Sequence, residues 1–276
     1  MKQRTRTLPG RGFRLGMRIW LGGTFFLLFF PILSIIVMSF NTSKFGTFPF
    51  EFTLSWYQKL FGESELLAST GYSLWFSFAV STCAALLGVT ASLALQHLPE
   101  KWNRRFSVVC NIPIIIPWLV QAVALLLLFN LLGIGRSFTS LFLGNLITVL
   151  PHSFLLTYAR VNSMDHGPEE AGRMLGASRL RVFWDITFPM IFPAVLAGWL
   201  MSFVLCFNCF SMQYYLAPFG TYTLPMRIFT MIRVGYDPDI NAIATIMCVV
   251  SIIVILLLNK IGFTADQLMG GGKKGK

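Results

Sequence analysis

The sequence predicts an all-α membrane protein with six transmembrane helices and both chain ends in the cytoplasm. Hydrophobic residues make up 55% of its 276 residues and charged residues only 12%, which is far from the balance of a soluble domain. The apolar residues form long runs of about 20 residues, the length that crosses a bilayer. The basic residues gather in alternate connections between these runs, and this asymmetry sets the orientation.

The first predicted span is 19–40, and it follows a basic segment, 1–18, that contains six Lys or Arg residues and no acid. A signal peptide is the alternative explanation for a basic start before an apolar run. This run is too long for the apolar region of a signal peptide and lacks a small-residue cleavage site, so a retained helix is predicted. Pro31 lies inside it, at a position where a kink is expected.

Five more apolar runs complete the predicted spans, and they are 74–98, 108–132, 141–161, 191–216 and 240–261. Small residues recur in the run 74–98, which suits close helix packing in lipid. Pro113 and Pro117 predict a broken or kinked helix in the run 108–132. The six spans form one membrane domain, 19–262, and the Gly- and Lys-rich tail, 263–276, is predicted to be cytoplasmic and disordered.

The charge distribution orients these spans. Of the 22 Lys and Arg residues, 17 lie in the N-terminal segment, the turn after the second span, the connection between the fourth and fifth spans, and the tail. The positive-inside rule therefore places these parts, with both termini, in the cytoplasm. The net charge of +11 follows from this topology, so a nucleic-acid partner is not predicted.

No catalytic arrangement and no cofactor site can be found along the chain. A phosphate-binding GxxxxGK[ST] loop, a nucleophile–base pair and a group of residues with metal-ligand spacing are all missing from the sequence. Cys206 and Cys209 form a CxxC pair within an apolar run, where two small helix residues are a better interpretation than a redox motif. His152 lies inside a span, where it is either a functional residue or a partner for a carbonyl freed by Pro151. The chain alone is not expected to be an enzyme.

The connection 163–190 carries the most specific local signals. Pro168 suits the first position of a helix, and Glu169 and Glu170 then lie at the positive end of the helix dipole. Gly176 is expected to end this helix, because a glycine readily takes a positive φ.

A second helix is predicted at 179–186, capped by Ser178 and ending before Pro189. Two short helices joined by a glycine turn make a rigid knob that suits docking to another protein. The alternative is an ordinary amphipathic turn in a cytoplasmic loop, since capping signals are common.

The same connection resembles the EAA loop of binding-protein-dependent ABC importer permeases. The resemblance rests on Glu170-Ala171-Gly172, then Leu175-Gly176-Ala177-Ser178, then Phe183, Ile186 and Pro189. Gly172 departs from the family, which usually has a second alanine there, and this loosens the first helix by up to about 1 kcal/mol. The resemblance implies the type I ABC importer permease fold and a coupling helix that fits a groove of a cytoplasmic ATPase subunit. The residues that it implies for coupling are Glu169, Glu170, Ala171, Gly172, Leu175, Gly176, Ala177, Ser178 and Pro189.

Other parts of the chain resemble the second permease subunit of spermidine/putrescine importers, and they are 39–46, 52–57, 223–229, 234–235 and 238–245. This resemblance implies a multi-pass protein of the bacterial inner membrane that forms a heterodimer with a second permease. Two ATP-binding subunits and an extracytoplasmic solute-binding protein are the other implied partners. ATP and Mg²⁺ would be bound by the ATPase subunits and not by this chain, and transport would proceed by alternating access.

The expected solute is small and polar, a polyamine or a related compound. Polyamine permeases typically have an aspartate after a proline of the third span and an acidic pair in the fifth, where this chain has Trp118, Asn208 and Cys209. A cation in a low-dielectric path favours carboxylates. Either the solute is less charged, or the partner permease supplies the acids, or the Trp118 ring attracts the cation. The residues expected to line the path are Trp118, Gln121, Asn208, Gln213 and Tyr214, the alternative being that Trp118 and Asn208 serve packing.

A self-sufficient secondary transporter or channel is the rival function. Such a protein is expected to show an internal repeat or an intramembrane charge relay. The six predicted spans contain no Asp or Glu, and no repeat is evident. The sequence therefore favours an importer subunit that depends on partners.

Overall fold

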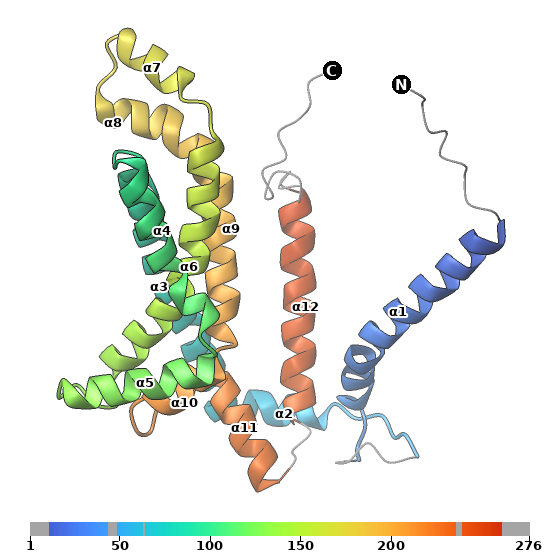
Figure 1. Ribbon diagram of the computed structural model, residues 1–276. Coiled ribbons are helices and arrows are strands. Elements are labelled where there is room, and N and C mark those ends of the chain that lie inside the picture. Colours follow the sequence, from blue (N-terminus) through green and yellow to red (C-terminus); the bar gives the residue numbers. More distant parts are fainter. Residues whose placement is uncertain (1–10, 44–48, 63, 236–238, 261–276) are drawn as a thin grey trace. The chain divides into compact units, whose positions relative to one another are not determined.

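The computed structural model describes residues 11–43, 49–62, 64–235 and 239–260, and every regular element in these ranges is a helix (Figure 1). The helical class predicted from the sequence is therefore confirmed. The chain divides into two compact units, Met1–Ser64 with Val234–Val254 and Glu65–Arg233 with Ile255–Lys276. The predicted tail, 263–276, and the first ten residues of the basic segment lie outside the described residues.

The first unit contains α1 (Arg11–Met38), α2 (Ser55–Gly62) and most of α12 (Asp239–Lys260). α1 begins within the predicted basic segment and continues through Pro31. Two contacts hold α2 in place: the Trp56 indole N–H donates to the carbonyl of Asn41 at 2.7 Å, and the Lys59 ammonium lies 2.8 Å from the carboxylate of Asp239. Asp239 is buried, so this ion pair anchors the start of α12.

The second unit is built around α3 (Ser64–Leu95), α6 (Phe138–Ser163) and α9 (Phe188–Phe207). These helices approach one another at Gly88, Ser153 and Gly198. A Cβ atom at Gly88 would lie 3.1 Å from the Ser153 Oγ, and one at Gly198 would lie 3.0 Å from the Ser153 Cα. Only residues without a side chain allow this spacing, which is how helices pack closely in lipid.

The third predicted span is broken at Pro117, whereas Pro113 lies inside the continuous helix α4 (Glu100–Ile115). α4 and α5 (Trp118–Leu131) meet at an angle of 104°. Ile116, the residue before Pro117, is extended, with φ −81° and ψ 127°. This is the conformation that a following proline imposes. α5 therefore turns away from α4 (Figure 1).

The fifth predicted span, 191–216, is not one helix, and that prediction is wrong. α9 ends at Phe207 and α10 (Phe210–Leu216) begins after Asn208 and Cys209. Side-chain amides add hydrogen bonds around the break: the Asn208 amide donates to Val204 O at 2.9 Å, beside the regular helical bond from the Asn208 N–H, and the Gln213 amide donates to Cys206 O at 2.9 Å. Neither a proline nor a glycine lies at this break, so the sequence pattern did not predict it.

α11 (Leu224–Val234) follows α10 and lies, with it, at the end of α9 remote from α7 and α8 (Figure 1). Its first backbone N–H donates to the Ser73 Oγ of α3 at 2.7 Å. Arg227 pairs with Glu65, also of α3. These contacts tie the connection before the last helix to the start of the second span.

Among the residues that the structure describes, four helices are long and apolar enough to cross a membrane, or five if the bent pair α4–α5 counts as one span. The four are Leu15–Met38, Glu65–Leu95, Phe138–Ser163 and Arg179–Phe207. At the position of the sixth predicted span, Asp239–Ile253 is a shorter apolar helix among the described residues. The number six and the orientation of the termini stay predictions.

Reporter fusions test that topology directly. Fusions after Lys101, after Gly167 and at the end of the chain should report the cytoplasm, because these sites lie in the connections rich in Lys and Arg. Fusions near Glu65 or Tyr222 should report the opposite side. A cytoplasmic signal at Tyr222 would contradict the six-span topology.

Candidate functional site

The connection between the fourth and fifth spans folds as two helical pieces at one end of the second unit (Figure 1). α7 (Gly167–Met174) comes first, followed by α8 (Arg179–Val182) and a π-helical turn, η1 (Phe183–Thr187), that leads directly into α9. The prediction that the second helix ends before Pro189 is wrong. The helix continues because η1 widens the turn: the N–H of Phe188 bonds to the carbonyl of Phe183, and a proline one residue later is accommodated.

The turn between α7 and α8 has the predicted geometry. Gly176 has a φ of +87°, its N–H bonds to Arg173 O at 3.0 Å, and the N–H of Ala177 bonds to Gly172 O at 3.1 Å. These two bonds form a Schellman motif, which ends a helix and reverses the chain. Ser178 caps α8 as predicted, because its Oγ accepts the N–H of Arg181 at 3.3 Å.

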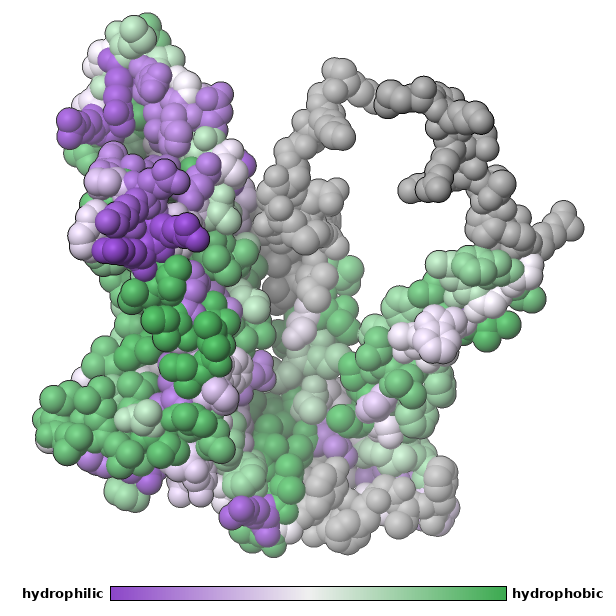
Figure 2. All heavy atoms as spheres, viewed as in Figure 1, coloured by the Kyte–Doolittle hydropathy of each residue, from purple (hydrophilic) through white to green (hydrophobic). Residues whose placement is uncertain are grey.

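Large apolar side chains project from this turn. Met174 and Leu175 are 90% and 89% exposed, and Leu180 and Trp184 are also mostly exposed. Figure 2 shows hydrophilic residues gathered over α7 and α8, so these apolar side chains stand within a polar surface. An exposed apolar group rimmed by charges is typical of a surface that another protein covers. We call these four residues the apolar knob.

A hydrogen-bonded network holds α7 against the spans. The Thr187 hydroxyl donates to the Glu169 carboxylate at 2.5 Å, and the Nδ1 of His166 lies 3.1 Å from the other oxygen of that carboxylate. The Gln96 amide, just after α3, lies 3.3 Å from the Nε2 of His166 and donates to Val161 O of α6 at 3.1 Å. A neutral imidazole with its proton on Nδ1 satisfies both neighbours, since it donates to Glu169 and accepts from Gln96.

The network includes residues that the sequence did not single out as functional, namely Gln96, His166 and Thr187. His166 precedes Glu169 by three residues and begins the same helix, so its pairing with the carboxylate could have been inferred from helical spacing. Thr187 and Gln96 are brought to the network by the packing of α9 and α3. Of the predicted coupling residues, Glu169 is the one that this network uses.

We expect the network to weaken in acid. Burial alone would raise the pKa of Glu169, but the hydrogen bonds from Thr187 and His166 and the positive charge of Arg173 outweigh it and lower the pKa below the usual 4.5. Because the pKa of Glu169 is lower in the folded state than in the unfolded state, the ionised carboxylate stabilises the fold at pH values above the ordinary pKa. This stabilisation is lost as the pH falls through the lowered pKa. Hydrogen exchange of α7, corrected for its intrinsic pH dependence, should stay constant from neutral pH to about pH 5 and accelerate below it. Glu169→Gln should remove this change, and a change that persists in that variant would contradict the assignment.

Two residues predicted to line the solute path lie at the start of α5. Trp118 packs against the core cluster that contains Cys206, Cys209 and Met212. Gln121 is buried, and its Oε1 makes no hydrogen bond. A buried acceptor without a partner is unusual, and it leaves Gln121 with an oxygen available to a ligand.

The other three predicted path residues lie at the break of the fifth span. Gln213 is buried and bonded on both sides, to Cys206 O at 2.9 Å and to the Thr223 hydroxyl at 2.5 Å. Asn208 and Tyr214 are exposed. α5 and α10 pack together, so the structure brings Trp118, Gln121 and Gln213 into one region. The hydrogen bonds of Gln213 stabilise the break between α9 and α10.

The cysteines lie where packing residues are expected. Cys206 and Cys209 are buried in the core cluster and are free thiols. Cys206 donates to the side-chain oxygen of Asn145 at 3.7 Å. Within the part of the chain that the structure describes, no group of three or more His, Cys, Asp or Glu side chains is placed to hold a metal ion.

Curated relatives of similar length match the chain over most of its extent. It is 34% identical to the spermidine/putrescine transport system permease protein PotC of Escherichia coli (strain K12) over 229 residues, 83% of this chain and 87% of the relative. It is 32% identical to PotC of Haemophilus influenzae over 230 residues, 83% and 90% of the two chains. It is 31% identical to the putrescine transport system permease protein PotI of E. coli K12 over 261 residues, 92% and 90% of the two chains.

Solved structures of ABC transporters share the fold. The transporter for the acidic polysaccharide alginate matches with a TM-score of 0.57 at 18% identity, covering 92% of this chain and 98% of the solved one. An amino acid ABC transporter matches with a TM-score of 0.55 at 19% identity, covering 74% and 94%. Residues 84–265, which include the apolar knob and its network, match the family model itself. The chain belongs to the binding-protein-dependent transport system inner membrane component family.

Proposed function

We propose that this chain is one permease subunit of an ATP-driven importer that passes a polyamine, or a related small polar solute, into the cytoplasm by alternating access. The identity to PotC and PotI over most of the chain supports the solute class. The proposed assembly contains a second permease, two ATP-binding subunits and an extracytoplasmic solute-binding protein. ATP and Mg²⁺ are bound by the ATP-binding subunits.

The observation that carries the proposal is the apolar knob. It lies on a turn whose first helix, α7, is held against the spans by the hydrogen-bonded network. In this proposal Met174 and Leu175 enter a groove of the ATP-binding subunit, where their burial contributes about 1.5–3 kcal/mol each. The network from Gln96 through His166 and Glu169 to Thr187 links the knob to the ends of three spans. A movement of the ATP-binding subunits would therefore rotate α3, α6 and α9 as one body.

The breaks of two spans supply the proposed solute path. The unpartnered Oε1 of Gln121 can accept an N–H of a solute ammonium, and the ring of Trp118 can attract its charge by about 0.5–2 kcal/mol. Neither group is a carboxylate, so the second permease must supply acids for a fully charged polyamine, or the solute carries less charge.

Transport by the reconstituted complex tests the proposal. Vesicles that contain both permeases, the ATP-binding subunits and the binding protein should accumulate solute only when ATP is supplied. Uptake by this chain alone, driven by an ion gradient, would instead establish the rival secondary transporter.

The solute class has its own test in the ligand of the binding protein. A screen across polyamines, amino-acid derivatives, sugars and phosphonates should give tight and selective binding of a polyamine or a less charged relative. Selective binding of a sugar would reject the solute class and leave the coupling mechanism standing.

A further inference from the structure

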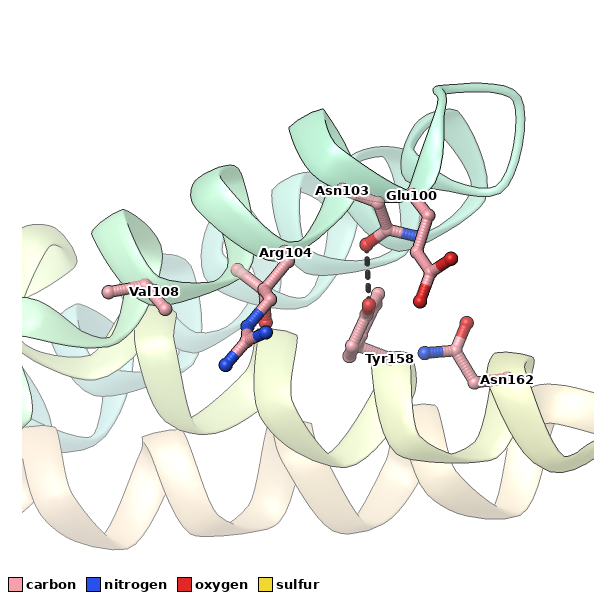
Figure 3. Close-up of a pocket in the computed structure, with 7 residues that line it drawn as sticks. Glu100, Asn103, Arg104, Val108, Tyr158 and Asn162 are labelled. Atoms are coloured by element: carbon pink, nitrogen blue, oxygen red, sulfur yellow. Dashed lines mark hydrogen bonds between the residues drawn. The ribbon is translucent and has the colours of Figure 1, made fainter.

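α4 and α6 line an open polar pocket of about 440 Å³ near the start of α4 and the end of α6 (Figure 3). Six of its seven lining residues are polar or charged, and the lining residues are Glu100, Asn103, Arg104, Ser107, Val108, Tyr158 and Asn162. The pocket is not part of the apolar knob, its network or the proposed solute path. It is therefore a separate site that needs its own explanation.

The pocket has opposite charges at its two sides. The Tyr158 hydroxyl donates to Asn103 Oδ1 at 2.5 Å and crosses from α6 to α4. Glu100 and Asn162 lie on one side of this bond and Arg104 on the other (Figure 3). Glu100 and Arg104 are one helical turn apart, yet among the described residues no ion pair joins them to each other or to a third group. Each keeps its charge available to a ligand.

The same face of α4 becomes apolar as it leaves the pocket. Val108, Ile112 and Ile115 follow the pocket residues at helical spacing and are 60%, 46% and 83% exposed. Figure 2 shows the change from hydrophilic to hydrophobic colours between the start of α4 and the rest of it. Near the pocket, the Arg105 guanidinium stacks over the Trp102 ring at 5.3 Å, an aromatic and basic pair typical of the membrane–water interface. A polar pocket that continues into an apolar strip at the interface is complementary to a phospholipid, which has a polar headgroup and apolar acyl chains.

We propose that this pocket binds a membrane phospholipid whose phosphate carries a primary ammonium, with phosphatidylethanolamine as the probe. Arg104, with Ser107 and the amide groups, binds the phosphate, since guanidinium and phosphate pair through charge-assisted hydrogen bonds. Glu100 binds the ammonium, and an acyl chain lies along Val108, Ile112 and Ile115. An anionic headgroup without an amine would face the Glu100 carboxylate with no compensating charge, so the pocket should discriminate between the two lipid classes.

Native mass spectrometry of the full chain in detergent tests this site. We expect phosphatidylethanolamine to bind about tenfold more tightly than phosphatidylglycerol with the same acyl chains, as one charged hydrogen bond predicts. Arg104→Gln should weaken both lipids by about tenfold. Glu100→Gln should abolish the preference for the amine lipid and should not weaken binding of phosphatidylglycerol.

Arg105→Gln is the matched control, because Arg105 neighbours Arg104 but does not line the pocket. It should bind both lipids as the unmodified chain does. Two results would overturn the proposal: equal binding of the two lipids by the unmodified chain, or an equal loss in Arg105→Gln and Arg104→Gln. Either result would mean that basic residues attract lipid in general and that the pocket is not a specific site. If Arg104→Gln fails to insert, Asn162→Ala must weaken the amine lipid for the proposal to stand.

Free phosphoethanolamine distinguishes the two sources of this headgroup chemistry. It should displace the lipid only at much higher concentration, because the apolar strip adds contact area for an acyl chain. Binding of phosphoethanolamine without any binding of the lipid would mean a site for a soluble phosphate and would overturn the lipid assignment.

Discussion

Replacing Gly176 by Val should lower solute uptake by at least about tenfold while the protein still inserts into the membrane. Gly176 has a φ of +87°, which is unfavourable by about 1–2 kcal/mol for a residue with a side chain, and more for a β-branched one. Nothing lies within 4 Å of a Cβ built at this position, so the substitution acts on the turn alone. The turn must open, and Met174 and Leu175 then lose their fixed position relative to Leu180.

Gly220→Val is the matched control for this prediction. Gly220 has a φ of +81°, and its Cβ would also meet nothing within 4 Å, so the local strain is the same. It lies in the turn between α10 and α11, far along the chain from the apolar knob. Uptake and co-purification of the ATP-binding subunits should fall in Gly176→Val and remain in Gly220→Val. Normal uptake with solute-stimulated ATP hydrolysis in Gly176→Val would refute the coupling role of this turn.

Thr187→Val should uncouple the knob from the spans and lower uptake by about tenfold or more. The substitution keeps the shape of the side chain and removes the hydroxyl that donates to Glu169 at 2.5 Å. A hydrogen bond to a charged group is worth about 1.5–3 kcal/mol, and a partly buried carboxylate that loses it is destabilised by a similar amount. We expect the ATP-binding subunits still to bind, because the knob itself is unchanged, but ATP hydrolysis should no longer respond to solute.

An exposed ion pair in the same segment provides the control for Thr187→Val. Arg181 and Asp185 lie 3.4 Å apart, and both are well exposed, so their pairing is worth only about 0–1 kcal/mol. Asp185→Asn should leave uptake close to that of the unmodified protein. In addition, Thr187→Val combined with Glu169→Leu should be little worse than either single change, since each removes the same hydrogen bond between the two residues. Fully additive losses would show that the two residues act independently, against the network.

Local chemistry was sufficient to predict the pieces of the connection 163–190. A glycine that can take positive φ, a serine that can cap and a run of acids at a helix start act within a few residues of one another. The glycine turn at Gly176 and the cap at Ser178 were therefore predicted correctly. The break of the third span was predicted for the same reason, because Pro117 has no backbone donor and restricts the residue before it.

Two features of the helices were not predicted: the break of the fifth span and the continuation of the second helix through Pro189. The fifth span breaks at Asn208 with no proline or glycine, and the amide of Gln213, seven residues further along the chain, donates to the carbonyl of Cys206 at that break. Pro189 does not end its helix, because the π turn before it provides the room that a proline needs. Both outcomes exchange one set of hydrogen bonds for another, and the sequence pattern does not show which set is made.

The sequence by itself determined that this chain is helical, that it crosses a membrane and that it carries a capped turn between two of its spans. Hydrophobic runs and local backbone preferences act over a few residues, so their results can be read in order along the chain. Only the tertiary structure decided that Gln96, His166, Glu169 and Thr187 form one network and that α4 and α6 line an open pocket with charged residues. The positions of these side chains are set by the close packing of helices at glycines such as Gly88 and Gly198, where an added Cβ would lie only about 3 Å from Ser153. This packing brings together residues that are far apart in the sequence.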